Sequence, residues 1–345
     1  MVGRGGVVAD GTLYLGSMEG RLVVVSTSDG TRQWSDQITT TSSGGFGCAA
    51  STTGVALYGT PAVAGDLVYI GGYNGEIYAF DTSSLQNMWV YPRKGNLEPI
   101  VSGLVVASGK VYFGGSDGKV YALDADTGND TVWEEPFQTG DKIWSTPVID
   151  DGTVYVSSFD RKLYALNATT GEKKWETAEV GGAIAATPLV YNNTVYFGSF
   201  DRYLYAVDAT DGSLKWKSEV EAGSWFWAKP VIYNNTIYAP SLDGKVYILD
   251  AENGHELVDA IDLGEPVSSS PVLVGSSIII ASEDGKVYAI ENNQKRELRD
   301  LREKIDAPLC ASNGVVYIHT QENDALYALD AATGAELWNV SLSSE

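Results

Sequence analysis

The chain has 345 residues, and its 45 acidic and 23 basic side chains give a formal net charge of −22. A field of this sign repels the phosphates of nucleic acids and of anionic membranes, so neither is expected as a partner. No apolar run reaches the roughly 18 residues of a membrane-spanning helix. The opening MVGRGGVVADG is too short and too glycine-rich to be a signal peptide.

A unit of about 42 residues repeats along the chain. The segment GTVYVSSFDRKLYALNATTGEKKW at 152–175 returns as NTVYFGSFDRYLYAVDATDGSLKW at 193–216. Each unit contains four short, alternating segments rich in Val, Tyr, Leu and Ile, joined by turns such as Asp151-Gly152, which predicts four strands. The second residue of the LYAL-like segment marks the units at Val23, Tyr78, Tyr121, Tyr164, Tyr205, Tyr247, Tyr288 and Tyr327.

Four-stranded units of this period are typical of β-propellers, because one blade cannot bury both of its faces alone. The sequence therefore predicts an all-β, eight-bladed β-propeller with four antiparallel strands per blade, in a single domain. The expected blades cover residues 1–38, 58–96, 97–140, 141–181, 182–222, 223–264, 265–305 and 306–345, with an insertion at 39–57.

The insertion at 39–57 separates the first two blades and carries Phe46 and Cys48. Long loops within compact repeats are usually functional or flexible. The other cysteine, Cys310, is predicted on the first strand of blade 8, next to blade 1. Two interpretations stay open: a Cys48–Cys310 disulfide that clamps the ring, or two buried free thiols.

A tryptophan follows the marker residue by 11 or 12 positions in six blades, which predicts packing between blades. These residues are Trp34, Trp89, Trp133, Trp175, Trp216 and Trp338. Blades 6 and 7 have Val258 and Arg299 instead, and the charged stretch 292–305 is expected to form a distorted outer strand or a short helix. Blade 8 contains all four strand segments, so the ring is expected to close by packing against blade 1.

The spacing D-A-x-T-G-x-x-x-W resembles the tryptophan-docking repeat of the pyrroloquinoline quinone (PQQ)-type propellers, which include quinoprotein dehydrogenases and the outer-membrane assembly lipoprotein BamB. For a dehydrogenase, this resemblance implies PQQ stacked on a tryptophan, a calcium ion and a vicinal disulfide. No two cysteines are adjacent here, so no cofactor is expected, with PQQ and calcium kept as alternatives. The basic candidates for the quinone carboxylates are Arg93, Lys94, Lys142, Arg161, Arg202 and Lys229.

The sequence gives little support for a metal site or for a catalytic triad. His255 and His319 belong to different blades, and neither has a cysteine nearby, so no zinc site and no Ser-His-Asp triad are expected. The oxygen-rich segment 124–130 uses the turn residues found in other blades, which argues against calcium there.

Large aromatic residues gather before three of the inner-strand prolines. Tyr58, Trp144 and Trp227 each stand three positions ahead of a proline, where other blades have Ala185 or Ser268. Trp225 and Phe226 add to blade 6, and Phe159 and Phe200 occupy hairpins expected on the same rim. Two interpretations stay open: these rings fill space between blades, or they form a partner-binding surface, since exposed aromatics near arginine make binding hot spots. The predicted rim site is Tyr58, Trp144, Trp225, Trp227, Lys229, Arg161, Arg202 and Phe46.

The sequence thus favours a non-catalytic scaffold or recognition propeller, a monomer that binds a protein or an extracellular polysaccharide at one rim. The alternative is a quinone- or sugar-binding sensor or a PQQ-dependent oxidoreductase. The family resemblance predicts an extracellular, periplasmic or cell-surface location. Five N-glycosylation sequons agree with it, at Asn129, Asn167, Asn192, Asn234 and Asn339.

Overall fold

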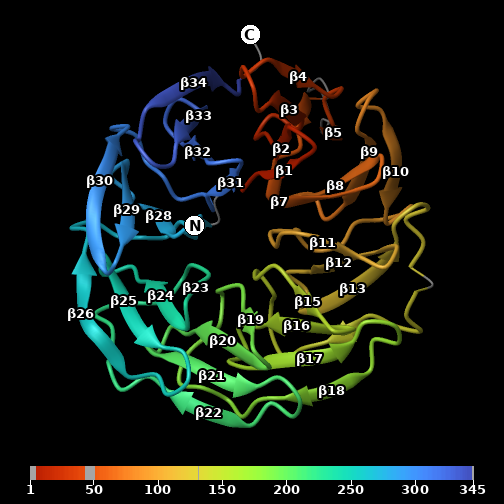
Figure 1. Cartoon of the computed structure of the whole chain (residues 1–345). Coiled ribbons are helices and arrows are strands. Elements are labelled where there is room, and N and C mark those ends of the chain that lie inside the picture. The colour runs from red at the N-terminus through yellow and green to blue at the C-terminus, as the bar shows by residue number, and fades with distance from the viewer. Residues whose placement is uncertain (1–4, 43–50, 131, 344–345) are drawn as a thin grey trace.

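Eight four-stranded antiparallel sheets are arranged in a ring, each with its first strand nearest the centre and its fourth strand outermost (Figure 1). The computed structural model describes residues 5–42, 51–130 and 132–343, and these contain no helix. The predicted eight-bladed all-β propeller is therefore confirmed.

Every blade is built from consecutive strands, listed here from the centre outward. Blade 1 consists of β1 (Val7–Ala9), β2 (Thr12–Gly16), β3 (Leu22–Ser26) and β4 (Arg32–Trp34), and blade 2 of β7 (Leu57–Ala64), β8 (Leu67–Gly72), β9 (Ile77–Asp81) and β10 (Asn87–Tyr91). Blade 3 consists of β11 (Val105–Ala107), β12 (Lys110–Gly114), β13 (Lys119–Asp124) and β14 (Phe137–Gln138), and blade 4 of β15 (Val148–Asp150), β16 (Thr153–Ser157), β17 (Leu163–Asn167) and β18 (Lys173–Glu176). Blade 5 consists of β19 (Leu189–Tyr191), β20 (Thr194–Gly198), β21 (Leu204–Asp208) and β22 (Leu214–Lys217), and blade 6 of β23 (Val231–Tyr233), β24 (Thr236–Pro240), β25 (Lys245–Asp250) and β26 (Glu256–Asp262). Blade 7 consists of β27 (Val272–Val274), β28 (Ser277–Ala281), β29 (Lys286–Glu291) and β30 (Gln294–Asp300), and blade 8 of β31 (Cys310–Ser312), β32 (Val315–Thr320), β33 (Ala325–Asp330) and β34 (Glu336–Ser341).

The two middle strands of a blade are buried on both faces, because each face packs against a neighbouring blade. In blade 5, Val195 belongs to the apolar cluster shared with blade 4, whereas the next residue, Tyr196, belongs to the cluster shared with blade 6. The period-two pattern thus sorts side chains between two blade junctions, and does not separate a core face from a solvent face.

Five of the six predicted tryptophans dock on the following blade. The indole N–H groups of Trp89, Trp133, Trp175 and Trp216 donate to the carbonyls of Ala125, Ala168, Ala209 and Ala251 at 3.0–3.2 Å. Each indole also covers a glycine of that turn. At Gly171, φ is +77° and an added Cβ would lie 2.5 Å from Trp133, so a larger residue is excluded there.

The sixth tryptophan, Trp34, also packs between blades, as predicted, but it lies at the junction with blade 8 and does not dock on the following blade. The β3–β4 pairing runs without the bulge seen in blades 2, 4, 5 and 8, so Trp34 lies opposite Val23. A shift of one residue turns a strand side chain to the other face. Trp34 accordingly packs towards blade 8, and its buried indole N–H has no hydrogen-bond partner in the part of the chain that the structure describes. On blade 2, Leu85 stands where the other turns have glycine and fills the junction between blades 1 and 2.

The ring closes as predicted, by packing of blade 8 against blade 1. The indole N–H of Trp338 donates to the Thr27 carbonyl at 3.1 Å, which repeats the docking contact of the other blades. The Arg32 guanidinium also donates to the Ser341 carbonyl. Within the described residues, no strand is exchanged between the two blades.

The charged stretch 292–305 of blade 7 forms an ordinary outer strand, β30, with one bulge in its pairing to β29. Arginines replace the tryptophan contact there. The Arg296 guanidinium donates to the Ala332 carbonyl at 2.8 Å, and Arg299 forms a 2.7 Å ion pair with Glu336. The alternative of a short helix is therefore wrong.

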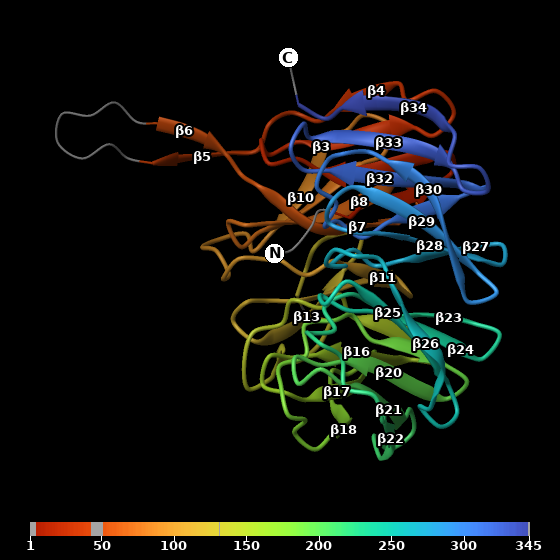
Figure 2. The same ribbon diagram turned by 90° about the vertical axis from the view of Figure 1, so that its left-hand side faces the viewer.

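The two ends of the insertion at 39–57 pair with each other as the strands of a hairpin. Strands β5 (Thr39–Ser42) and β6 (Ser51–Gly54) pair antiparallel and project away from the ring (Figure 2). Phe46 and Cys48 lie outside the described residues. The hairpin leaves the ring where the Ile38 N–H donates to Gly20, in the loop between β2 and β3.

Cys310 on β31 is a free thiol, and burial raises its pKa to about 12. Because the thiolate is the reactive species, we expect Cys310 to react slowly with an aromatic disulfide reagent at pH 8 in the folded protein. In a Cys48→Ser variant, which isolates this thiol, urea should expose one rapidly reacting group without any reductant. A fast reaction in the folded state would contradict the burial, and no reaction in urea would contradict the free thiol.

Candidate functional site

One rim of the propeller brings together the loops that precede the inner strands and the hairpins between second and third strands. The Phe159 N–H donates to the Lys142 carbonyl, and the Leu242 N–H donates to the Trp225 carbonyl at 3.0 Å. The same pairing recurs at Phe200 and Ala183. These bonds hold the two predicted groups of aromatics on a common rim.

Five aromatic side chains from blades 4, 5 and 6 form a continuous cluster on this rim. We call Trp144, Phe159, Phe200, Trp225 and Trp227 the aromatic rim cluster. The Phe200 ring stacks on Trp225 with centroids 4.4 Å apart and planes at 10°, and on Trp227 at 5.6 Å and 18°. The Trp144 ring meets Phe159 edge-on at 4.8 Å and Trp227 at 6.4 Å.

The cluster is open to solvent at one end. Trp225 is 46% exposed, whereas Trp144 and Trp227 are half-buried. This agrees with the expected partial exposure of these three tryptophans; their role in binding stays a prediction. Phe226 instead belongs to the core. It is 1% exposed and packs against Tyr247 between blades 5 and 6.

The ammonium group of Lys142 contacts the aromatic rim cluster. The Lys142 ammonium lies 4.4 Å from the Trp144 ring centroid and 4.6 Å from that of Phe159, within the range of cation–π attraction. The sequence pointed to Lys142 only as a basic candidate for a quinone. Its place two residues before Trp144, on the same loop, is the signal that could have assigned it to the cluster.

The remaining predicted site residues do not join the cluster. Tyr58 pairs with Tyr73 on blade 2 at 5.5 Å. Arg161 and Arg202 are exposed and form ion pairs with Glu179 and Glu221, so their charges already have partners.

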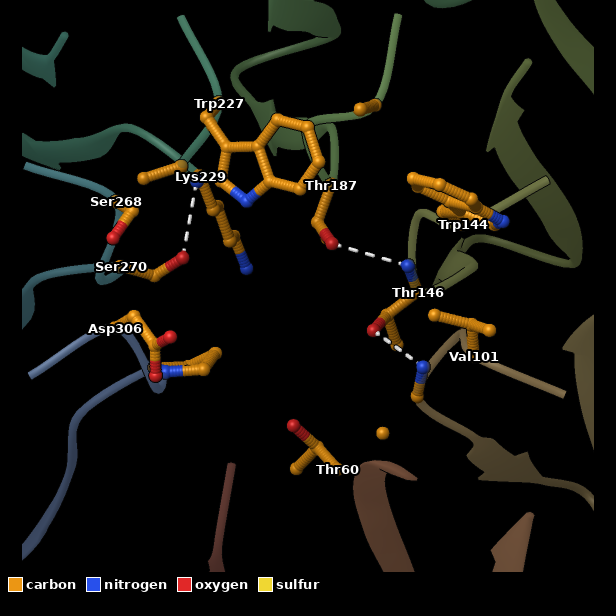
Figure 3. A pocket seen from close by; sticks show the side chains of 15 residues that line it. Thr60, Val101, Trp144, Thr146, Thr187, Trp227, Lys229, Ser268, Ser270 and Asp306 are labelled. Carbon is orange, nitrogen blue, oxygen red and sulfur yellow. Dashed lines mark hydrogen bonds between the residues drawn. The ribbon is translucent and has the colours of Figure 1, made fainter. Parts of the chain in front are cut away.

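Lys229 faces the centre of the ring, where it lines a cavity of about 70 Å³. The loops before the inner strands supply the walls. Trp227 lies beside Lys229, and Trp144 with Val101 lies across the cavity (Figure 3). Thr146, Thr187 and Ser270 add hydroxyl groups. The cavity lining thus combines one cation, hydroxyl groups and apolar side chains.

This cavity does not fit PQQ. Organic cofactor sites typically have about 300–1,000 Å³, well above the space here. Of the basic candidates, only Lys229 lines the cavity, whereas the exposed Arg93 donates to Thr127 and Asn129 on blade 3. Among the described residues, no three His, Cys, Asp or Glu side chains are grouped to hold a metal ion.

The two histidines lie apart, as expected. His255 pairs with Glu219 at 3.0 Å on the surface, and the His319 Nε2 lies 2.8 Å from Asp324 in blade 8. The described part of the chain contains no helix long and apolar enough to cross a membrane.

Eight docked blades in a closed ring define a β-propeller repeat protein. The family model described as "Outer membrane protein assembly factor BamB" matches residues 2–159 and 116–340. The chain therefore belongs to this BamB-like family of propellers. No curated protein matches the sequence.

Solved structures share the fold at low sequence identity. The computationally designed Ika8 protein is 16% identical, with a TM-score of 0.75 over 94% of each chain. BamB from Moraxella catarrhalis is 18% identical, with a TM-score of 0.73 over 91% of this chain and 92% of that one. Quinohemoprotein alcohol dehydrogenase from Comamonas testosteroni is 16% identical, with a TM-score of 0.65 over 83% of this chain and 67% of that one.

Proposed function

We propose that this protein is a non-catalytic recognition propeller that binds a protein partner through the aromatic rim cluster. The observation that carries the proposal is the exposed Trp225, which is stacked on the half-buried Phe200 on a rigid ring. Tryptophan is enriched among the residues that dominate binding energy at protein interfaces. Membership of a family named for an assembly factor supports a protein partner over a polysaccharide.

The geometry of the cluster suits a partner that inserts apolar anchors. The rings of Phe159 and Phe200 hold the tryptophans in place, so little side-chain entropy is lost when a partner covers them. Lys142 adds one positive charge to a rim that also carries Glu283, Glu303 and Glu322 on blades 7 and 8. A partner that contacts both regions would place apolar residues over blades 4 to 6 and basic residues over blades 7 and 8.

We also place the site of action outside the cytoplasm, as the family name suggests. Of the five sequon asparagines, only Asn167 is half-buried; Asn129, Asn192, Asn234 and Asn339 are exposed. Cell fractionation with an antibody against the protein would test this location, and recovery in the cytoplasmic fraction would contradict it.

Photo-crosslinking tests the proposed function. We expect p-benzoylphenylalanine at position 225 to give a discrete covalent adduct with one protein in an extract of the native organism. The matched control is position 257, because Leu257 lies on the outer strand of the same blade and is also 46% exposed. Equal adducts at both positions, or none at 225, would contradict rim recognition. An adduct with a polysaccharide at position 225 would show that the partner is a polysaccharide, which the sequence also predicted, and not a protein.

A further inference from the structure

Five blades contribute a residue from the same position of the repeat to the lining of the central cavity. The residue just before the inner-strand proline is Thr60 in blade 2, Thr146 in blade 4, Thr187 in blade 5 and Ser270 in blade 7. Blade 6 has Lys229 at this position. All five residues line the cavity.

The hydroxyl groups link neighbouring blades around the cavity (Figure 3). The Gly103 N–H donates to Thr146 Oγ1 at 3.2 Å, and the Thr146 N–H donates to Thr187 Oγ1 at 3.1 Å. The Lys229 N–H donates to Ser270 Oγ at 3.1 Å. Between blades 5 and 6 the series is interrupted, because a protonated lysine offers no acceptor. Among the described residues, the Thr187 N–H has no hydrogen-bond acceptor.

Lys229 also lacks a counter-charge. No carboxylate of the described residues forms an ion pair with its ammonium, in a chain that has 45 acidic residues. The Asp306 carboxylate also lines the cavity. Its Oδ2 accepts from the Gln321 side chain and lies 3.9 Å from the Lys304 ammonium, whereas its Oδ1 is buried with no hydrogen-bond partner among the described residues. Burial lowers the pKa of Lys229. A partly buried cation without an anion is costly, and a bound anion would remove that cost.

We propose that the cavity beside Lys229 is a carboxylate-binding site, in which Lys229 Nζ, the Thr187 N–H and the hydroxyls of Thr187 and Ser270 are the donors. Each of these hydroxyls accepts a backbone N–H and keeps its own O–H free to donate. The apolar wall of Trp227, Trp144 and Val101 favours an organic acid with a short hydrocarbon part over an inorganic anion. The small cavity limits that part to a few atoms. This site does not depend on recognition at the rim.

The carboxylate can come from two sources, a small free acid or the end of a peptide chain that reaches into the cavity. Sodium acetate represents the first and N-acetylglycine the second, and the neutral N-acetylglycinamide controls for contacts that need no charge. Tighter binding of acetate would identify a free acid as the ligand. Tighter binding of N-acetylglycine would identify a chain end.

Saturation-transfer difference NMR on the ligand methyl groups, at constant ionic strength, measures these affinities on the full chain. We expect saturable binding of at least one carboxylate and none of the amide. In the Lys229→Thr variant the binding should weaken at least tenfold. This variant should fold, because threonine occupies the position in three other blades and its hydroxyl can accept the Thr187 N–H. The Lys245→Met variant removes an exposed lysine of the same blade that does not line the cavity, and it should bind as the wild type does.

Three results would overturn the proposal. These are the absence of saturable binding to the wild type, unchanged binding in both Lys229→Thr and Lys229→Met, and competition by sodium chloride with the same affinity as acetate. The last result would leave only a general anion site. Circular dichroism of the two variants distinguishes a lost site from a lost fold, and Lys229→Met tests the charge if Lys229→Thr does not fold.

Discussion

Replacing Trp225 with alanine should weaken binding to the rim partner about 30-fold or more, which corresponds to about 2 kcal/mol for the loss of a buried aromatic anchor. The partner is the protein captured by crosslinking at this position, and surface plasmon resonance measures its affinity. The fold should survive, since Trp225 is 46% exposed and its main contact is one stacked ring, Phe200. The loss of that stacking should cost about 1 kcal/mol of the free energy of unfolding.

The control is Leu257→Ala, which removes an equally exposed apolar side chain from the outer strand of the same blade. It should leave the affinity unchanged. If Trp225→Ala binds as tightly as the wild type, or if it unfolds the protein, the aromatic rim cluster serves packing and not recognition.

The second large effect is expected on stability, from the loss of a tryptophan that packs between two blades. Trp216→Ala should lower the free energy of unfolding by about 3–5 kcal/mol, as large-to-small changes in cores do. Trp216 is 7% exposed, its ring is tilted against that of Tyr196 with centroids 5.8 Å apart, and its indole N–H donates to the Ala251 carbonyl. The change therefore removes packing and a hydrogen bond together. Equilibrium unfolding in urea measures the difference.

Trp34→Ala is the matched comparison, since Trp34 holds the same place in the repeat but has turned to the other face. Its indole N–H has no partner and its ring is half-buried, so its removal should cost less than half as much. Equal losses for the two variants would show that docking on the next blade contributes little to stability.

The fold was predictable because its packing is local and repeated. Each blade contacts its two neighbours through the same few positions, so a period of about 42 residues and the tryptophan spacing were sufficient to predict eight blades. The orientation of Trp34 was not predictable from that spacing, because one missing bulge reverses it. Leu85, in a position held by glycine in other blades, was the available signal.

The site was predicted in part. Comparison of equivalent positions pointed to Trp225, Trp227 and Trp144, which do lie together. It could not distinguish Phe226, which faces the core, from its exposed neighbour, because alternate residues of an extended segment point in opposite directions. Arg161 and Arg202 were expected near the tryptophans, but acidic neighbours from other parts of the same blades engage them.

The docking of Trp338 on Thr27 repeats, between the last and first blades, the contact that joins four pairs of successive blades within the chain. Closure of the ring therefore uses a contact that the repeat already encodes. We infer that gain or loss of a whole repeat between docked blades would leave the closing contact of the same kind, so evolution could change the number of repeats without first inventing a new closure.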